Sequence, residues 1–63
     1  MASVKEIDAG VAAVTPKINE WIEILVPALF RNSIRQAVDS PMGRGYVFDA
    51  VRRALEAAER VRT

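Results

Sequence analysis

Arginine is the residue type in this sequence with the clearest potential chemistry, and it is concentrated in one half of the chain. All seven arginines lie in residues 31–63, whereas residues 1–30 are mildly acidic. Guanidinium groups pair well with phosphate oxygens, so a nucleic-acid surface is one interpretation, with the contacts Arg44, Arg52, Arg53 and Arg60. Against it, acidic residues are interleaved with these arginines, which favours an ordinary solvated face. The same asymmetry between the halves would favour antiparallel or head-to-tail packing of copies.

The segment Met42-Gly43-Arg44-Gly45 is a second candidate for anion chemistry. Its glycines could let backbone N–H groups approach a phosphate, with Arg44 supplying charge. It lacks the Lys and Ser/Thr of a P-loop and follows no predicted strand. Two glycines in three residues are more typical of a flexible interhelical turn, and that is what we predict.

Catalysis, metals and cofactors find little support in the residue types. The sequence contains no His and no Cys, which removes the commonest bases, nucleophiles and soft metal ligands. A site for Ca²⁺ or Mg²⁺ built from carboxylates is formally open, but no Asp spacing resembles an EF-hand loop. A few short helices would not easily enclose a pocket of a few hundred Å³. We therefore expect no enzyme, no cofactor and no small-molecule substrate.

The size of the chain points to a partner. We expect residues 1–63 to form a single domain with no separate linker, and 51% of the residues are hydrophobic. A domain this small has a marginal core, and disulfides, metals or oligomerisation usually reinforce it. We expect the last of these, with the chain itself or a larger protein as partner. No signal segment and no membrane-spanning run is visible, so we expect a cytoplasmic location, as in many small bacterial and phage accessory proteins.

The first predicted element is a helix over residues 3–14. Ser3 and Glu6 match the capping-box pattern, and the apolar residues that follow share one face: Val4, Ile7, Val11 and Val14. Gly10 weakens a helix by roughly 1 kcal/mol, but it also permits close approach of another backbone. Thr15-Pro16 is then typical of a new helix start, which places a boundary between Val14 and Lys17.

The second element spans residues 16–39 and is interrupted by Pro27. In a helix interior, proline removes a hydrogen bond and clashes with the carbonyl four residues earlier. The apolar stripe also rotates there, from Ile18, Ile22, Leu25 and Leu29 to Val26, Phe30, Ile34, Ala37 and Val38. Two interpretations remain open: one kinked helix, or two helices separated near Pro27. The first stripe would face the helix over 3–14 and the second would face the last helix.

The last element is a helix over residues 45–61, preceded by a turn over residues 39–45. Its apolar residues are placed on one side and its charged residues on the other, with i,i+4 acid–base pairs in the favourable order. The predicted fold class is therefore all-α, with three to four short helices in a hairpin or small bundle that is completed by oligomerisation.

The functional hypothesis follows from the stretch Trp21–Phe30, which is apolar nearly all the way round and needs cover on more than one side. We predict a small non-enzymatic protein–protein interaction or assembly module that self-associates through this stretch and the C-terminal helix. The expected interface residues are Trp21, Leu25, Leu29, Phe30, Ile34 and Phe48. The competing interpretation is that they form the monomer's own core. Nucleic-acid binding through the arginines of residues 31–62 is the alternative function, and Glu20 and Glu23 disfavour an anionic membrane surface.

Overall fold

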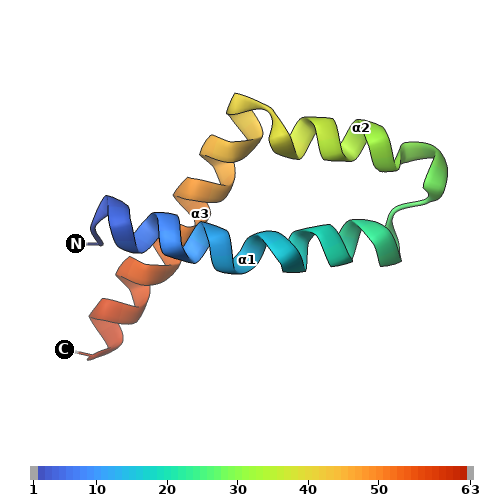
Figure 1. Ribbon diagram of the computed structural model, residues 1–63. Helices are drawn as coiled ribbons and strands as arrows, with labels where there is room; N and C mark the ends of the chain where they lie inside the picture. The colour runs from blue at the N-terminus through green and yellow to red at the C-terminus, as the bar shows by residue number, and fades with distance from the viewer. Residues whose placement is uncertain (1, 63) are drawn as a thin grey trace.

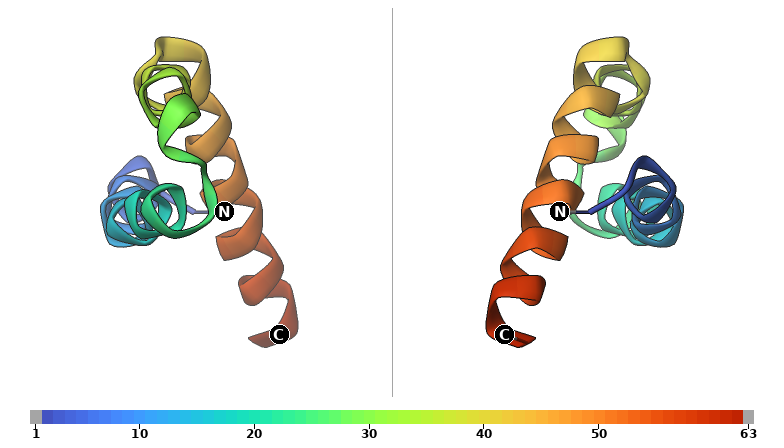
Figure 2. Two further views of the ribbon diagram at one scale, coloured as in Figure 1. Left: turned by 90° about the vertical axis from the view of Figure 1, so that its right-hand side faces the viewer. Right: turned by 90° about the vertical axis from the view of Figure 1, so that its left-hand side faces the viewer.

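The computed structural model describes residues 2–62 and contains three α-helices within them. They are α1 (Val4–Leu25), α2 (Ala28–Asp39) and α3 (Pro41–Arg62). α1 and α2 form an antiparallel hairpin, and α3 runs obliquely across one side of both (Figures 1 and 2). The C-terminal half of α3 projects beyond α1. The predicted all-α class is confirmed.

The start of α1 follows the predicted capping box. The Ser3 hydroxyl accepts a hydrogen bond from the Glu6 backbone N–H at 3.2 Å, and the Glu6 carboxylate accepts one from the Ser3 backbone N–H at 3.3 Å. Two of the N–H groups that a helix start leaves unpaired are thereby satisfied.

The predicted boundary at Thr15-Pro16 is wrong, because α1 continues through Pro16 to Leu25. The physical reason is that the apolar face does not change direction there. At 100° per residue, Ile7, Val11, Ile18 and Ile22 lie within about 60° of one another, and the first and last of them are buried. Thr15 does not cap a helix start; its hydroxyl donates to the Val11 carbonyl at 2.7 Å. Since residues 3–14 and Trp21 belong to one helix, the predicted packing of one on the other is also wrong.

At Pro27 the chain does break, so the two-helix interpretation is the one observed. α1 ends at Leu25 and Pro27 is the N-cap of α2. Without an N–H at Pro27, the Glu23 carbonyl loses its helical donor, and the Arg31 guanidinium replaces it with an Nη2–O distance of 2.9 Å. Arg31 Nε also donates to the Val26 carbonyl at 3.1 Å. One side chain of α2 thus caps the end of α1 and holds the hairpin closed.

The predicted turn over 39–45 is wrong, because α3 begins at Pro41 and includes both glycines. Ser40 joins the two helices: its hydroxyl donates to the Ala37 carbonyl at 2.6 Å and accepts from the Gly43 N–H at 3.1 Å. A Cβ on Gly43 would lie 2.1 Å from the Ala37 carbonyl oxygen. Gly43 is therefore needed for close approach at the α2–α3 corner, not for flexibility.

The helices cross closely but bury little. A Cβ on Gly10 would lie 2.6 Å from Val51 Cγ1, which confirms the predicted close approach at Gly10 and sets the α1–α3 crossing there. The buried hydrophobic residues of the described chain are Ile7, Ile22 and Val26. The radius of gyration is 13.5 Å, against about 11 Å for a compact domain of this length. The three helices therefore form an open arrangement around a small core.

Candidate interaction surface

The end of the hairpin (Figure 1) carries several exposed apolar side chains, which together we call the hairpin surface. It consists of residues from the end of α1 and the start of α2: Trp21, Ile24, Leu25, Leu29 and Phe30. Leu29 is 83% exposed and Trp21, the only tryptophan, is 50% exposed. A shallow hollow of about 300 Å³ lies on the α1 part of this surface, lined by Lys17, Glu20, Trp21, Ile24 and Leu25. The break at Pro27 brings the two parts to the same end of the molecule.

Four of the six predicted interface residues lie on the hairpin surface, and the other two lie elsewhere. Ile34 is half-buried on α2, one turn beyond Phe30. Phe48 is half-buried on α3 and lines a groove between all three helices. The structure thus does not bring the predicted set together as one continuous patch. The alternative that all six form the monomer's core does not hold for the four exposed residues.

The groove beside Phe48 is larger than we expected from so short a chain. Its volume is about 510 Å³, and it is lined by Asp8, Val11, Thr15, Ile18, Asn19, Val38, Asp39, Arg44, Val47 and Phe48. The groove is open to solvent, so the three helices line this space without enclosing it. Arg44, predicted as an anion or nucleic-acid contact, lines this groove with the acidic Asp8 and Asp39.

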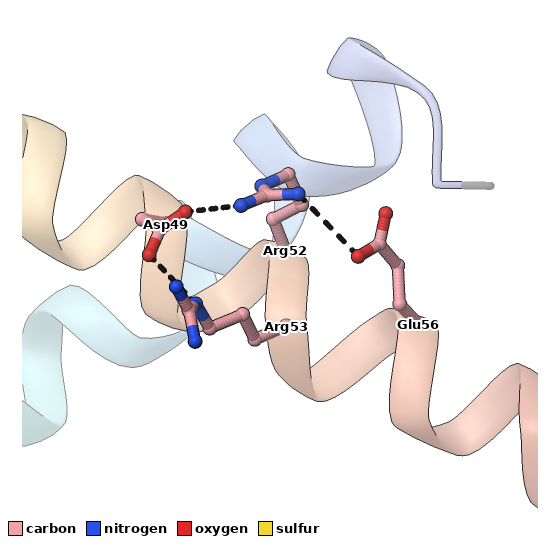
Figure 3. Close-up of polar contacts among 4 residues, drawn as sticks. All are labelled: Asp49, Arg52, Arg53 and Glu56. Atoms are coloured by element: carbon pink, nitrogen blue, oxygen red, sulfur yellow. Dashed lines mark hydrogen bonds and ion pairs between the residues drawn. The ribbon is translucent and has the colours of Figure 1, made fainter.

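The other predicted nucleic-acid contacts lie further along α3, where carboxylates pair with two of them. Asp49 bonds the guanidinium groups of both Arg52 and Arg53, the latter at 2.9 Å, and Glu56 lies 3.4 Å from Arg52 (Figure 3). The hydrogen bonds from Arg52 and then Arg53 hold the pKa of Asp49 below its ordinary value, and the Asp49 carboxylate raises the pKa of Arg52. Arg60 lies in the last turn of α3. Local pairing thus neutralises much of this basic face.

A second exposed apolar surface runs along α3, the C-terminal helix through which self-association was predicted, but its residues were not among the predicted interface residues. Its residues recur every three or four positions and are all exposed: Met42, Tyr46, Ala50, Ala54, Ala57 and Val61. We call this set the outer stripe. The sequence interpretation placed Tyr46, Ala50, Val51 and Leu55 on one apolar side, but the structure divides them. Val51 and Leu55 are half-buried. The regular spacing of the outer stripe was a signal that could have separated the two faces.

Neither metal chemistry nor comparison with known proteins adds a site. Within residues 2–62, acidic side chains form no group of three or more that could hold a metal ion. None of the described helices is both long and apolar enough to cross a membrane. The chain matches no protein-family model, no curated protein and no solved structure.

Proposed function

We propose that this chain is a small assembly module that associates with further copies of itself through the hairpin surface. The proposal rests on one observation: the chain exposes more surface than a compact monomer of the same mass would. The accessible area is 5156 Å², whereas a compact monomer of 7.0 kDa exposes about 4,000 Å². The excess of roughly 1,100 Å² is comparable to the ~800 Å² per partner that a standard protein interface buries.

The composition of the hairpin surface supports this role. Trp and Phe are enriched in the buried centres of interfaces, and Trp is among the commonest energetic hot spots. The hairpin surface contains both aromatic residues together with Ile24, Leu25 and Leu29, and all of them are exposed. Leaving such a group in water forgoes the free energy that burial of each side chain would supply, about 1.5–3 kcal/mol.

Copies of the same chain are the favoured partner over an unrelated protein. The net charge of +1 gives little repulsion between copies. The open arrangement of the monomer, with few buried side chains, suits a protein whose core is completed only on assembly. A larger protein partner is the competing possibility, and it would be indicated if the chain stays monomeric yet folded.

Nucleic-acid binding remains the second functional candidate, and the ion pairs of α3 argue against it. Asp49 engages both Arg52 and Arg53, while Arg31 and Arg35 are engaged with Glu23 in the hairpin. A phosphate would have to displace these carboxylates and carbonyls. We therefore place this function below self-assembly.

Trp21 provides a direct optical test. Because it is the only tryptophan and lies on the hairpin surface, burial on association should shift its emission to shorter wavelength as protein concentration rises. Leu29→Glu should abolish this concentration dependence. Asn32→Glu is the matched control, since Asn32 is an exposed polar residue of the same helix and the change adds the same charge. Equal behaviour of both variants and the unaltered chain would overturn the proposal.

A further inference from the structure

We infer that the outer stripe of α3 pairs antiparallel with the outer stripe of a second copy, forming an interface separate from the hairpin surface. This inference rests on the proposed function and deepens it, because it names the helix, the direction and the register of a self-contact. Its occupant is a second α3.

α3 has an inner side that is packed and an outer side that is exposed. Its inner side packs against the hairpin, with Val51 opposite Gly10. At about 100° per residue, the centre of the outer stripe lies roughly opposite the side formed by Phe48 and Leu55. No helix of the described chain covers that outer side (Figure 2). Met42, Tyr46 and Val61 are each at least 80% exposed there.

The length of the outer stripe and the sizes of its residues determine how a second copy can pair with it. From Met42 to Val61 it extends about 28 Å at 1.5 Å per residue. Large side chains stand at its N-terminal end, small ones in the middle, and Val61 at its C-terminal end. An antiparallel copy centred between Val51 and Arg52 would set Tyr46 against Ala57 and Met42 against Val61. A large residue then meets a small one, and the alanines let the two backbones approach closely.

A parallel pair fits less well. It would set Tyr46 against Tyr46 and Ala57 against Ala57, so bulky side chains would separate the helices at one end and leave a gap at the other. Voids and overpacking both destabilise an interface as they do a core. The sizes of the exposed residues therefore select the antiparallel direction.

The charged residues beside the outer stripe also fit the antiparallel direction. Asp49 and Arg53 lie along one edge of the stripe and bond each other within the chain at 2.9 Å. In the antiparallel register Arg53 of one copy lies alongside Asp49 of the other, on the same edge. Each carboxylate can then be shared between guanidinium groups of both copies. Like charges are not brought opposite one another, so the pairing is complementary in sign as well as in size.

Two separate self-contacts on one chain have a consequence for the assembly. A single two-fold contact closes at a dimer, but two different two-fold contacts generate a closed tetramer or an open chain. With the hairpin surface and the outer stripe both occupied, the assembly contains more than two copies.

Disulfide trapping tests the inference, because the chain contains no cysteine of its own. Ala50→Cys lies beside the proposed two-fold axis and should form a covalent dimer under mild oxidation. Ala9→Cys is the matched control, an exposed alanine of α1 outside both surfaces. Adjacency raises effective concentration from micromolar to about millimolar, so the rate for Ala50→Cys should exceed the control by roughly a thousandfold. Equal rates would overturn the inference.

Direction is tested by mixing two variants. Met42→Cys and Val61→Cys should form the mixed disulfide when the two variants are mixed. Each variant alone should form few disulfides, because in the antiparallel pair each position lies far from the same position of the other copy. Efficient disulfide formation by each variant alone would show a parallel pair and overturn the inference. If Leu29→Glu dissociates the protein while Ala50→Cys is not trapped, the hairpin surface stands and the α3 contact fails. If the chain is monomeric throughout, both proposals fail.

Discussion

Gly10 of α1 lies directly against Val51 of α3, so closely that a Cβ at position 10 would stand 2.6 Å from Val51 Cγ1. This contact sets where the two long helices cross. Neighbouring positions on each helix are buried or half-buried, among them Ile7 and Leu55. The small core of the molecule depends on this crossing, and the first prediction follows from it.

Gly10→Ala should destabilise the fold although alanine is the better helix former. Alanine gains about 1 kcal/mol of helix propensity, but overpacking typically costs 1–3 kcal/mol, and the stiff Val51 side chain has little freedom to move. Adding Val51→Ala should remove the clash, so the double variant should be more stable than the sum of the two single effects. Denaturant unfolding of the unaltered chain, the two single variants and the double variant, all at one protein concentration, measures the four free energies of unfolding. Strict additivity would show that the two residues do not meet.

Gly43→Ala and Gly45→Ala should have opposite effects. A Cβ at position 43 would meet backbone carbonyl oxygens of Ala37 and Val38, which cannot turn aside, whereas nothing lies within 4 Å of a Cβ at position 45. Gly45→Ala should stabilise the helix by about 0.5–1 kcal/mol, and Gly43→Ala should destabilise the corner by more than that gain. The free energies of unfolding of the two variants check this. A stabilised Gly43→Ala variant would mean that the α2–α3 corner is not as tight as described.

Arg31→Met should cost more stability than Arg35→Met. Arg31 supplies the two carbonyls at the end of α1 with charged hydrogen bonds, each of a kind worth about 1.5–3 kcal/mol when well shielded. Arg35 makes only a half-exposed ion pair with Glu23, a kind worth roughly 0–1 kcal/mol. Thermal and denaturant unfolding of the two variants should rank them in this order. If Arg35→Met is the more damaging change, then the guanidinium cap is not what holds the hairpin.

The ion pairs of α3 predict a specific dependence on pH. Because Arg52 and Arg53 lower the pKa of Asp49 from 3.8, the folded state favours the charged carboxylate. Its stabilising contribution is complete above the unfolded-state pKa and is lost as pH falls through the lower folded-state pKa. The stability difference between the unaltered chain and Asp49→Asn should therefore shrink as the solution is acidified below about pH 4. A difference that stays constant with pH would contradict the pairing.

Much of the fold could be predicted from local sequence, because several of its determinants are local. The Ser3–Glu6 capping box and the interruption at Pro27, predicted as either a kink or a break, both depend on residues within a few positions of each other. The exposed hydrophobic surface near Trp21 could also be predicted, since a stretch that is apolar all round cannot be covered by so short a chain.

What could not be predicted depends on tertiary contacts. Pro16 looks like a helix start, but burial of Ile7 and Ile22 on one face holds α1 continuous across it. Gly43 looks like a residue of a flexible turn, but glycine is required there because a Cβ would clash with backbone carbonyl oxygens of α2. The spacing along α3 could have separated its two apolar sides, but which of them packs on α1 depends on the crossing of the two helices at Gly10 and Val51. The predicted interface residues therefore did not include the outer stripe.

Sedimentation equilibrium of the unaltered chain at several micromolar concentrations tests self-assembly most directly. The monomer mass is 7.0 kDa. We predict a fitted mass that rises with concentration to more than twice this value, and a return toward the monomer mass for Leu29→Glu. A helical, well-folded species that stays at 7.0 kDa at every concentration would contradict the account and leave a different protein as the partner of the hairpin surface.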